Sequence, residues 1–144
     1  MNNKFLFISL FVLFLSFYSL TAPAQAVVGY HQSSLPFVNL GYEINDRFIP
    51  ELRIGTNLDL EDVTVFELAL LYQFVDKSEV EFYGGIAPGS FNDDTSVAIP
   101  LGLNIYPFER RNFGFHLEVA PLLINEATTI LRGSWGIRYR FGGE

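Results

Sequence analysis

The residues of this sequence that could do chemistry are carboxylates, guanidinium groups and a histidine at alternate positions of strand-like segments. His116 and Glu118 are two residues apart on one face of such a segment, which is a conceivable acid–base pair. Ser134 and Arg132 share the corresponding face of another segment, but no Ser or Cys lies at a spacing typical of a nucleophile beside a base. The chain has 2 His and no Cys, which disfavours a transition-metal site. We therefore predict no catalytic residue, no cofactor and no metal site.

A strand directs successive side chains to opposite faces, so each strand-like segment has two faces of different composition. One face carries large apolar residues throughout. The other face carries the charged groups, separated mainly by Gly and Ala. The charged set that we predict to share one interior is Glu43, Glu51, Arg53, Glu67, Glu81, His116, Glu118, Arg132, Arg138 and Arg140. Unpaired burial of these charges would be costly, so we expect a structural network of ion pairs, and we expect Arg138→Ala and Glu67→Ala to lower the unfolding temperature.

Two acidic segments are candidate cation sites, because Ca²⁺ and Mg²⁺ prefer oxygen ligands. They are Asp59-Leu60-Glu61-Asp62 and Asn92-Asp93-Asp94. Neither has the spacing of an EF-hand loop, and solvated loop tips are the simpler interpretation. Both interpretations stay open from sequence.

The N-terminus has the layout of a secretory signal peptide. One Lys precedes an apolar run from Phe5 to Leu20, and Ala24-Gln25-Ala26 provides the small residues of a cleavage site. We predict a signal peptide over 1–26 and one β-barrel domain over 27–144. Removal of Lys4 changes the formal net charge from −7 to −8, so no basic surface for nucleic acid is expected.

The remaining sequence reads as strands and turns, with no convincing amphipathic helix. The segments with period-two alternation are Leu35–Ile44, Phe48–Leu58, Val63–Phe74, Val80–Pro88, Val97–Phe108, Phe113–Leu123 and Ile130–Phe141, with Val27–His31 as a short first strand. Short polar turns alternate with the acidic or small-residue loops 59–62, 89–95 and 125–129. This order predicts an antiparallel up-and-down meander of eight strands.

The total volume of the large apolar side chains determines which face points inward. An eight-stranded barrel holds on the order of a dozen layered side chains, far fewer than this face supplies. The opposite face, rich in Gly and Ala, suits a narrow interior. We therefore predict that the apolar face contacts lipid and that the sheet closes into a transmembrane β-barrel, because open edges are costly in hydrocarbon. Aromatic residues beside the short turns, among them Phe74, Tyr106 and Phe113, resemble an interfacial girdle.

The whole pattern resembles small bacterial outer-membrane β-barrel proteins, the broad class of eight-stranded OmpA-like and OmpX-like barrels. That resemblance rests on the signal peptide, the alternating strands, the alternating turn lengths and the last strand. It implies that Trp135, Ile137, Tyr139 and Phe141 form an assembly signal read by the barrel assembly machinery. It also implies a location in the outer membrane of a Gram-negative bacterium, in contact with lipid and lipopolysaccharide.

We predict a monomeric, non-enzymatic outer-membrane barrel with a plugged, ion-paired lumen and a structural or surface-interaction role. One alternative is a soluble secreted β-barrel that binds an apolar ligand. A lipid-modifying barrel enzyme is another, but the outer third of each strand offers few catalytic polar residues.

Overall fold

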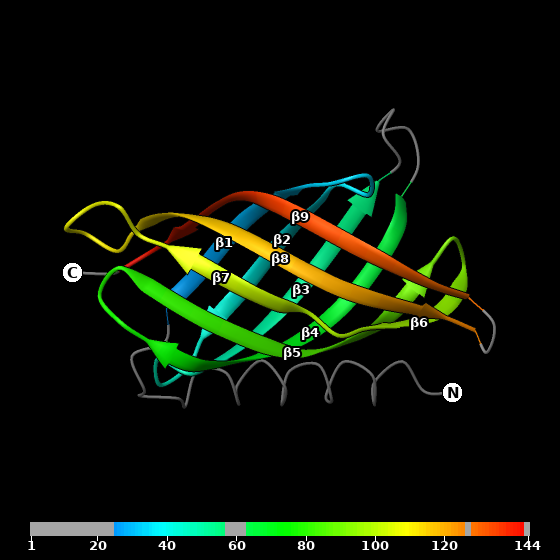
Figure 1. The fold of residues 1–144 in the computed structure, drawn as a ribbon, viewed down its shortest axis with the longest axis horizontal. Coiled ribbons are helices and arrows are strands. Elements are labelled where there is room, and N and C mark those ends of the chain that lie inside the picture. The colour runs from blue at the N-terminus through cyan, green and yellow to red at the C-terminus, as the bar shows by residue number, and fades with distance from the viewer. Residues whose placement is uncertain (1–24, 57–62, 126–127, 143–144) are drawn as a thin grey trace, which may run out of the picture.

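The computed structural model describes residues 25–56, 63–125 and 128–142 as a closed antiparallel β-barrel (Figure 1). Residues 1–24 of the predicted signal peptide, which was placed at 1–26, and the acidic segment 59–62 lie outside the described residues, and Gln25 and Ala26 begin the first strand. No helix within the described ranges is long and apolar enough to cross a membrane. The barrel wall is formed by β1 Gln25–Gln32, β2 Phe37–Glu43, β3 Phe48–Thr56, β4 Val63–Asp76, β5 Val80–Phe91, β6 Asp94–Ala98, β7 Leu101–Ile105, β8 Phe113–Ile124 and β9 Thr128–Arg140.

Consecutive strands pair along the chain, except that β6 and β7 each pair with both β5 and β8, and β9 pairs with β1 to close the wall. The closing seam runs from Val27 opposite Arg140 to Gln32 opposite Trp135. A sheet closed in this way leaves no long open edge through the wall, as a lipid-facing sheet requires. The predicted all-β up-and-down barrel is confirmed, including the short first strand, which is longer than predicted at both ends.

Strands β6 and β7 are two halves of one wall strand, so the wall has eight strands as predicted. Ala98 pairs with Ala87 and Leu101 with Gly84, which is one continuous register on β5. Pro100 lies between the halves and has no N–H to donate to the neighbouring strand. The predicted continuous strand Val97–Phe108 is therefore interrupted at Ile99–Pro100, and it ends earlier, at Ile105.

Two tight turns depend on residues that tolerate positive φ. Asn45 and Asp46 have φ of 53° and 54°, and Asn92 and Asp93 have φ of 46° and 69°. Positive φ at both central residues is the hairpin turn whose twist matches the flanking strands. The predicted loop 89–95 is wrong, because β5 continues to Phe91 and β6 begins at Asp94, which leaves only Asn92–Asp93 between them.

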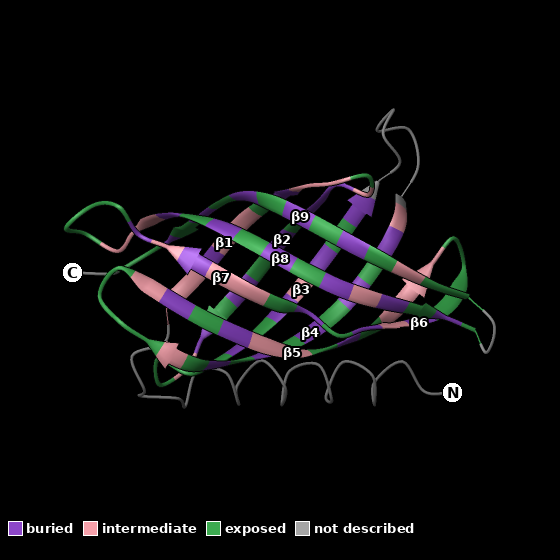
Figure 2. Cartoon of the chain, in the orientation of Figure 1, coloured by how far each residue is buried: buried purple, intermediate pink, exposed green. Residues whose placement is uncertain are grey.

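Burial alternates residue by residue along the strands, as Figure 2 shows for β8 and β9. Large apolar side chains such as Leu68, Leu101 and Trp135 are exposed on the outer surface. The residues that alternate with them along each strand lie on the inner face and are buried. The prediction that the apolar face points outward is confirmed. An apolar cluster within the barrel comprises Ile49, Ala69, Leu71, Tyr83, Ala87, Ala98, Ala120, Leu122 and Ile124, with Phe91 and Ile130 packed against it.

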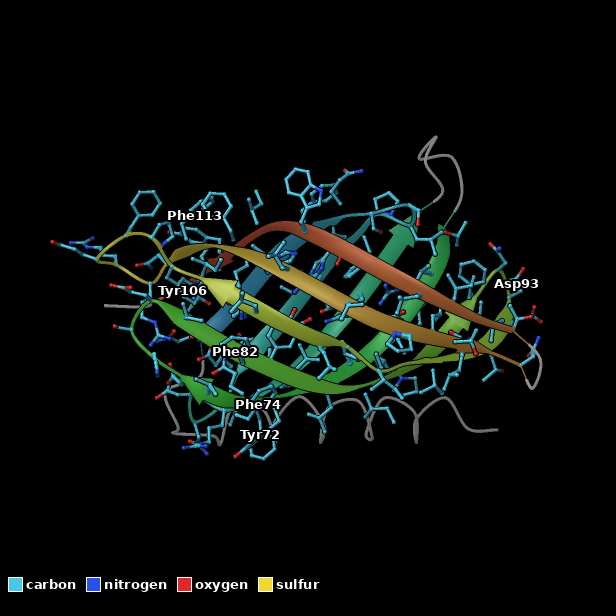
Figure 3. All side chains as sticks on the ribbon, in the orientation of Figure 1. Tyr72, Phe74, Phe82, Asp93, Tyr106 and Phe113 are labelled. Carbon is cyan, nitrogen blue, oxygen red and sulfur yellow. The ribbon has the colours of Figure 1, made fainter. Side chains whose placement is uncertain are left out.

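Many of the outward aromatic residues lie at the end of the barrel that carries the short turns and the end of β9, which we call the turn end. Figure 3 labels Tyr72, Phe74, Phe82 and Phe113 there, opposite Asp93 at the other end, which we call the loop end. Tyr106 is an exception to the predicted girdle. It is 1% exposed, and its hydroxyl lies inside the barrel.

Candidate functional site

The structure places all ten residues of the predicted charged set inside the barrel, on β2, β3, β4, β5, β8 and β9. Each is at most 5% exposed. They lie on strands that face each other across the lumen, so side chains distant in sequence meet. The contacts divide this set into a central group, a group near the turn end and Arg138 between them.

The central group consists of two bidentate ion pairs. Arg53 donates to both carboxylate oxygens of Glu118, with distances of 2.8 and 2.9 Å. Arg132 donates to both oxygens of Glu67 at 2.7 and 3.1 Å. The Arg53 Nε also donates to Glu51 at 3.1 Å. Bidentate pairs fix both the distance and the orientation of the guanidinium plane, so they hold opposite walls in register.

An aromatic stack supports the central arginines. Phe37 lies beneath both guanidinium groups, with its ring centroid 5.2 Å from Arg53 Cζ and 4.7 Å from Arg132 Cζ. The His31 ring stacks on Phe37 at 4.0 Å, and the His116 ring lies 3.7 Å from His31. Cation–π contacts of this kind strengthen when they are desolvated. The stack therefore helps to fix the arginine side chains.

The group near the turn end is centred on Glu81. Its Oε2 accepts hydrogen bonds from Gln73 at 3.0 Å, Tyr106 at 3.1 Å and Asn104 at 3.2 Å. Its Oε1 pairs with Arg140 at 3.0 Å and with Arg111. The same Arg140 Nη2 lies 2.5 Å from Glu43. Glu81 thus has several donors, which compensates for the cost of burying its charge.

Arg138 behaves differently from the other three predicted arginines. It is 4% exposed, yet within the described ranges no carboxylate lies within ion-pair distance of it. Its Nε and Nη2 have no hydrogen-bond partner among the described residues. We therefore expect Arg138→Ala to destabilise the barrel less than Glu67→Ala, a difference that could not be predicted from the sequence pattern.

Several interior residues were missed from sequence. Tyr83, Tyr106, Gln73 and Asn104 all hydrogen-bond to buried carboxylates, and His31 lies within the central stack. Their positions on the inward face could have identified all of them, because even Tyr106 shares the parity of Asn104 in the predicted strand Val97–Phe108. The charged set of the sequence analysis contained only ionisable side chains, so it did not include these neutral hydrogen-bond donors.

A substitution of Tyr83 tests whether a neutral donor to a buried carboxylate stabilises the barrel. Its hydroxyl donates to Glu118 Oε2 at 2.8 Å and is buried. We expect Tyr83→Phe to lower the free energy of unfolding by about 1–3 kcal/mol, because a buried charged acceptor loses a partner. Urea titration in lipid vesicles measures this. The control is Tyr42→Phe, on the exposed face, and an equal effect in both variants would contradict the role of Tyr83.

Within the ranges that the structure describes, these side chains do not form a catalytic constellation. Glu118 is held by Arg53 and Tyr83, and His116 stacks on His31, so the two do not form the conceived acid–base pair. His31 Nδ1 lies 3.2 Å from Ser134 Oγ, but both residues are buried inside the barrel. Among the described residues, no group of three His, Asp or Glu is arranged to hold a metal ion.

The closed antiparallel wall of eight strands defines the class: the chain has the fold of transmembrane β-barrels. No protein-family model matches the sequence, and no curated protein matches it. The N-terminal β-barrel domain of Pseudomonas aeruginosa OprF is similar with a TM-score of 0.63 and 19% identity, over 82% of this chain and 96% of that one.

Two further solved structures have the same fold. Ail, the attachment invasion locus protein of Yersinia pestis, is similar with a TM-score of 0.51 and 20% identity, over 82% of this chain and 98% of that one. A de novo designed transmembrane β-barrel has a TM-score of 0.58 and 12% identity, over 81% of this chain and 93% of the design. At these identities the likeness concerns the fold alone.

Proposed function

We propose that this chain is a non-enzymatic outer-membrane β-barrel whose lumen is closed by ion pairs, with a structural or surface-interaction role. The observation that carries the proposal is the pair of bidentate bridges, Arg53 to Glu118 and Arg132 to Glu67, which join opposite walls. Side chains linked in this way fill the cross-section of a barrel of this size. The apolar cluster that includes Ala87, Ala98 and Leu122 adds to the filling.

The proposed surroundings are outer-membrane lipid and lipopolysaccharide, with the turn end in the periplasm and the loop end outside the cell. The exposed Leu, Ile, Val and Phe side chains around the wall support a lipid environment and disfavour the soluble ligand-binding alternative. The ion pairs in the central lumen are a second argument against an apolar ligand there. We infer that the barrel is a monomer.

The proposal includes the assembly machinery as a partner during biogenesis. Trp135, Ile137, Tyr139 and Phe141 are all exposed on the outer face of the last strand, where a recognition factor can reach them before closure. Their alternation with buried Arg138 and Arg140 keeps the two faces distinct. This role comes from the resemblance to outer-membrane barrels.

A fractionation experiment tests the location. We expect the protein to remain in the membrane fraction until detergent is added and to migrate differently on gels before and after heating. Both results follow from a closed sheet with an apolar outer surface. Release by periplasmic lysis without detergent would favour the soluble alternative.

A conductance experiment tests the closed lumen. We expect no steady conductance from the purified protein in a planar lipid bilayer, because the central ion pairs and the apolar cluster occupy the lumen. A buffer-only membrane is the control. A large, steady conductance would contradict the plugged lumen.

A further inference from the structure

The last strand of the barrel extends beyond the first strand with which it closes the wall. The pairing of β1 with β9 stops at Gln32 opposite Trp135. Strand β9 continues to Thr128 and stays paired with β8 as far as Ile124 opposite Thr128. Figure 1 shows β9 continuing past the end of β1 toward the loop end. The segment from Thr128 to Ser134 is thus paired on one side only, as far as the described residues show.

The backbone bonds show which groups are left on the open side. The Arg140 N–H donates to Asn112 on the β8 side, and the Phe141 N–H donates to Ala26 on the β1 side. Backbone groups of an antiparallel strand alternate between its two neighbours. The N–H and C=O groups of Thr129, Leu131 and Gly133 therefore point toward the open side.

This open edge is accessible from outside the barrel. No described backbone group is hydrogen-bonded to Thr129, Leu131 or Gly133 on that side. Leu131 is 70% exposed, more than the other large apolar residues on the surface. A Cβ placed on Gly133 would have no neighbour within 4 Å. We call Thr129–Gly133 the β9 edge.

An unpaired strand edge favours one kind of partner. Its alternating donors and acceptors match the backbone of an extended chain, which adds as a further strand. The β9 edge is five residues long, from 129 to 133, which corresponds to roughly 17 Å of extended chain. At the border of the lipid, unpaired backbone groups are costly, so pairing is more favourable there than in water.

The charges near the β9 edge indicate the chemistry of the partner. The charged residues in the described connections at the loop end are acidic, with Asp93 in the β5–β6 turn and Asp94 at the start of β6, and the chain has a formal net charge of −7. Strand β6 pairs with β8, and β8 pairs with β9. By register, Asp94 lies two strands from β9 and two residues beyond the row of Thr128, so a chain that pairs with the β9 edge and continues past Thr129 approaches the acidic loop end. A cationic chain is therefore attracted, and a second copy of this acidic chain is disfavoured.

We propose that the β9 edge binds an extended, cationic segment of another polypeptide as an added β-strand. This inference rests on the proposed function in one respect, the placement of the loop end outside the cell. It specifies the surface and the partner chemistry of the surface-interaction role.

The experiment uses the isotope-labelled barrel in lipid nanodiscs and two short synthetic peptides, one alternating lysine with valine and the other glutamate with valine. With the lysine peptide, the amide signals of Thr129, Leu131 and Gly133 are expected to shift and their hydrogen exchange to slow. Amides directed toward β8, such as Ile130 and Arg132, should change little. The glutamate peptide should bind on the order of tenfold more weakly.

A proline variant tests the edge itself. Leu131→Pro removes an N–H that points to the open side, and it leaves the bonds between β8 and β9 in place. It should abolish the shifts at Thr129 and Gly133, whereas Leu131→Thr, which keeps the N–H, should retain them. Heat-modifiable migration of each variant verifies that the barrel has formed.

Three results would overturn the inference. They are peptide binding that persists in Leu131→Pro, edge amides that already exchange slowly without peptide, and equal binding of both peptides. Self-association of the wild type through this edge, measured by sedimentation, would identify a second copy as the occupant and would also refute the cationic partner. Failure of heat-modifiable migration in the wild type would instead refute the proposed membrane barrel, so the two failures are distinguishable.

Discussion

Arg53→Met is expected to lower the free energy of unfolding by about 3–5 kcal/mol, because it leaves buried carboxylates without their main cation. Arg53 is fully buried and donates to Glu118 and Glu51. Its guanidinium also lies 3.9 Å from Glu67. Urea titration in lipid vesicles, followed by heat-modifiable migration and by the fluorescence of the single Trp, measures the change.

Two further variants separate the ion pair from other effects of the substitution. Arg47→Met also removes an arginine, but from an exposed position where Nη1 contacts the Tyr72 hydroxyl, so a change within about 0.5 kcal/mol is expected. Arg53→Met combined with Glu118→Leu removes both charges and should recover much of the loss. Equal stabilities of the single and double variants would show that the carboxylate is not the source of the loss.

Gly136→Ala is expected to disrupt closure of the barrel. A Cβ on Gly136 would lie 1.8 Å from the Tyr30 carbonyl oxygen and 3.0 Å from His116 Nε2. The backbone of β1 cannot yield without breaking the hydrogen bonds that close the wall. We expect destabilisation of about 3 kcal/mol or more, at the upper end of overpacking effects, and a reduced yield of heat-modifiable protein.

The matched control lies three residues away on the same strand. Gly133→Ala places a methyl group where no atom lies within 4 Å, so stability should change by less than about 1 kcal/mol. Both variants introduce the same chemical change into β9. If they were equally stable, the close approach of β1 and β9 at Gly136 would not be important for closure.

The sequence was sufficient to predict the fold class and the face of most side chains. Period-two alternation assigns each strand residue to one of two faces without knowledge of its neighbours. The volume of the apolar set then determined which face points outward. The same rule failed locally at Asn92–Asp93, where a tight turn of two residues was taken for a longer loop. The residues that permit positive φ were visible in sequence, but their exact position in the turn was not.

Which arginine pairs with which glutamate inside the barrel depends on the tertiary structure. Arg53 and Glu118 are 65 residues apart, as are Arg132 and Glu67, so no local spacing links them. The stagger of the strands when β9 closes on β1 sets which inward residues reach the same height. That stagger places Arg138 opposite Gly29 and Gly114, away from ion-pair distance of the carboxylates, although its inward position resembles that of Arg140.

The sequence by itself thus determined which side chains point inward, because that depends only on the two-residue period of a strand. Only the tertiary structure decided which charges pair, which neutral donors complete them and where β9 is left with an open edge. These features depend on register and strand length around a closed wall, and register is a property of all eight strands together.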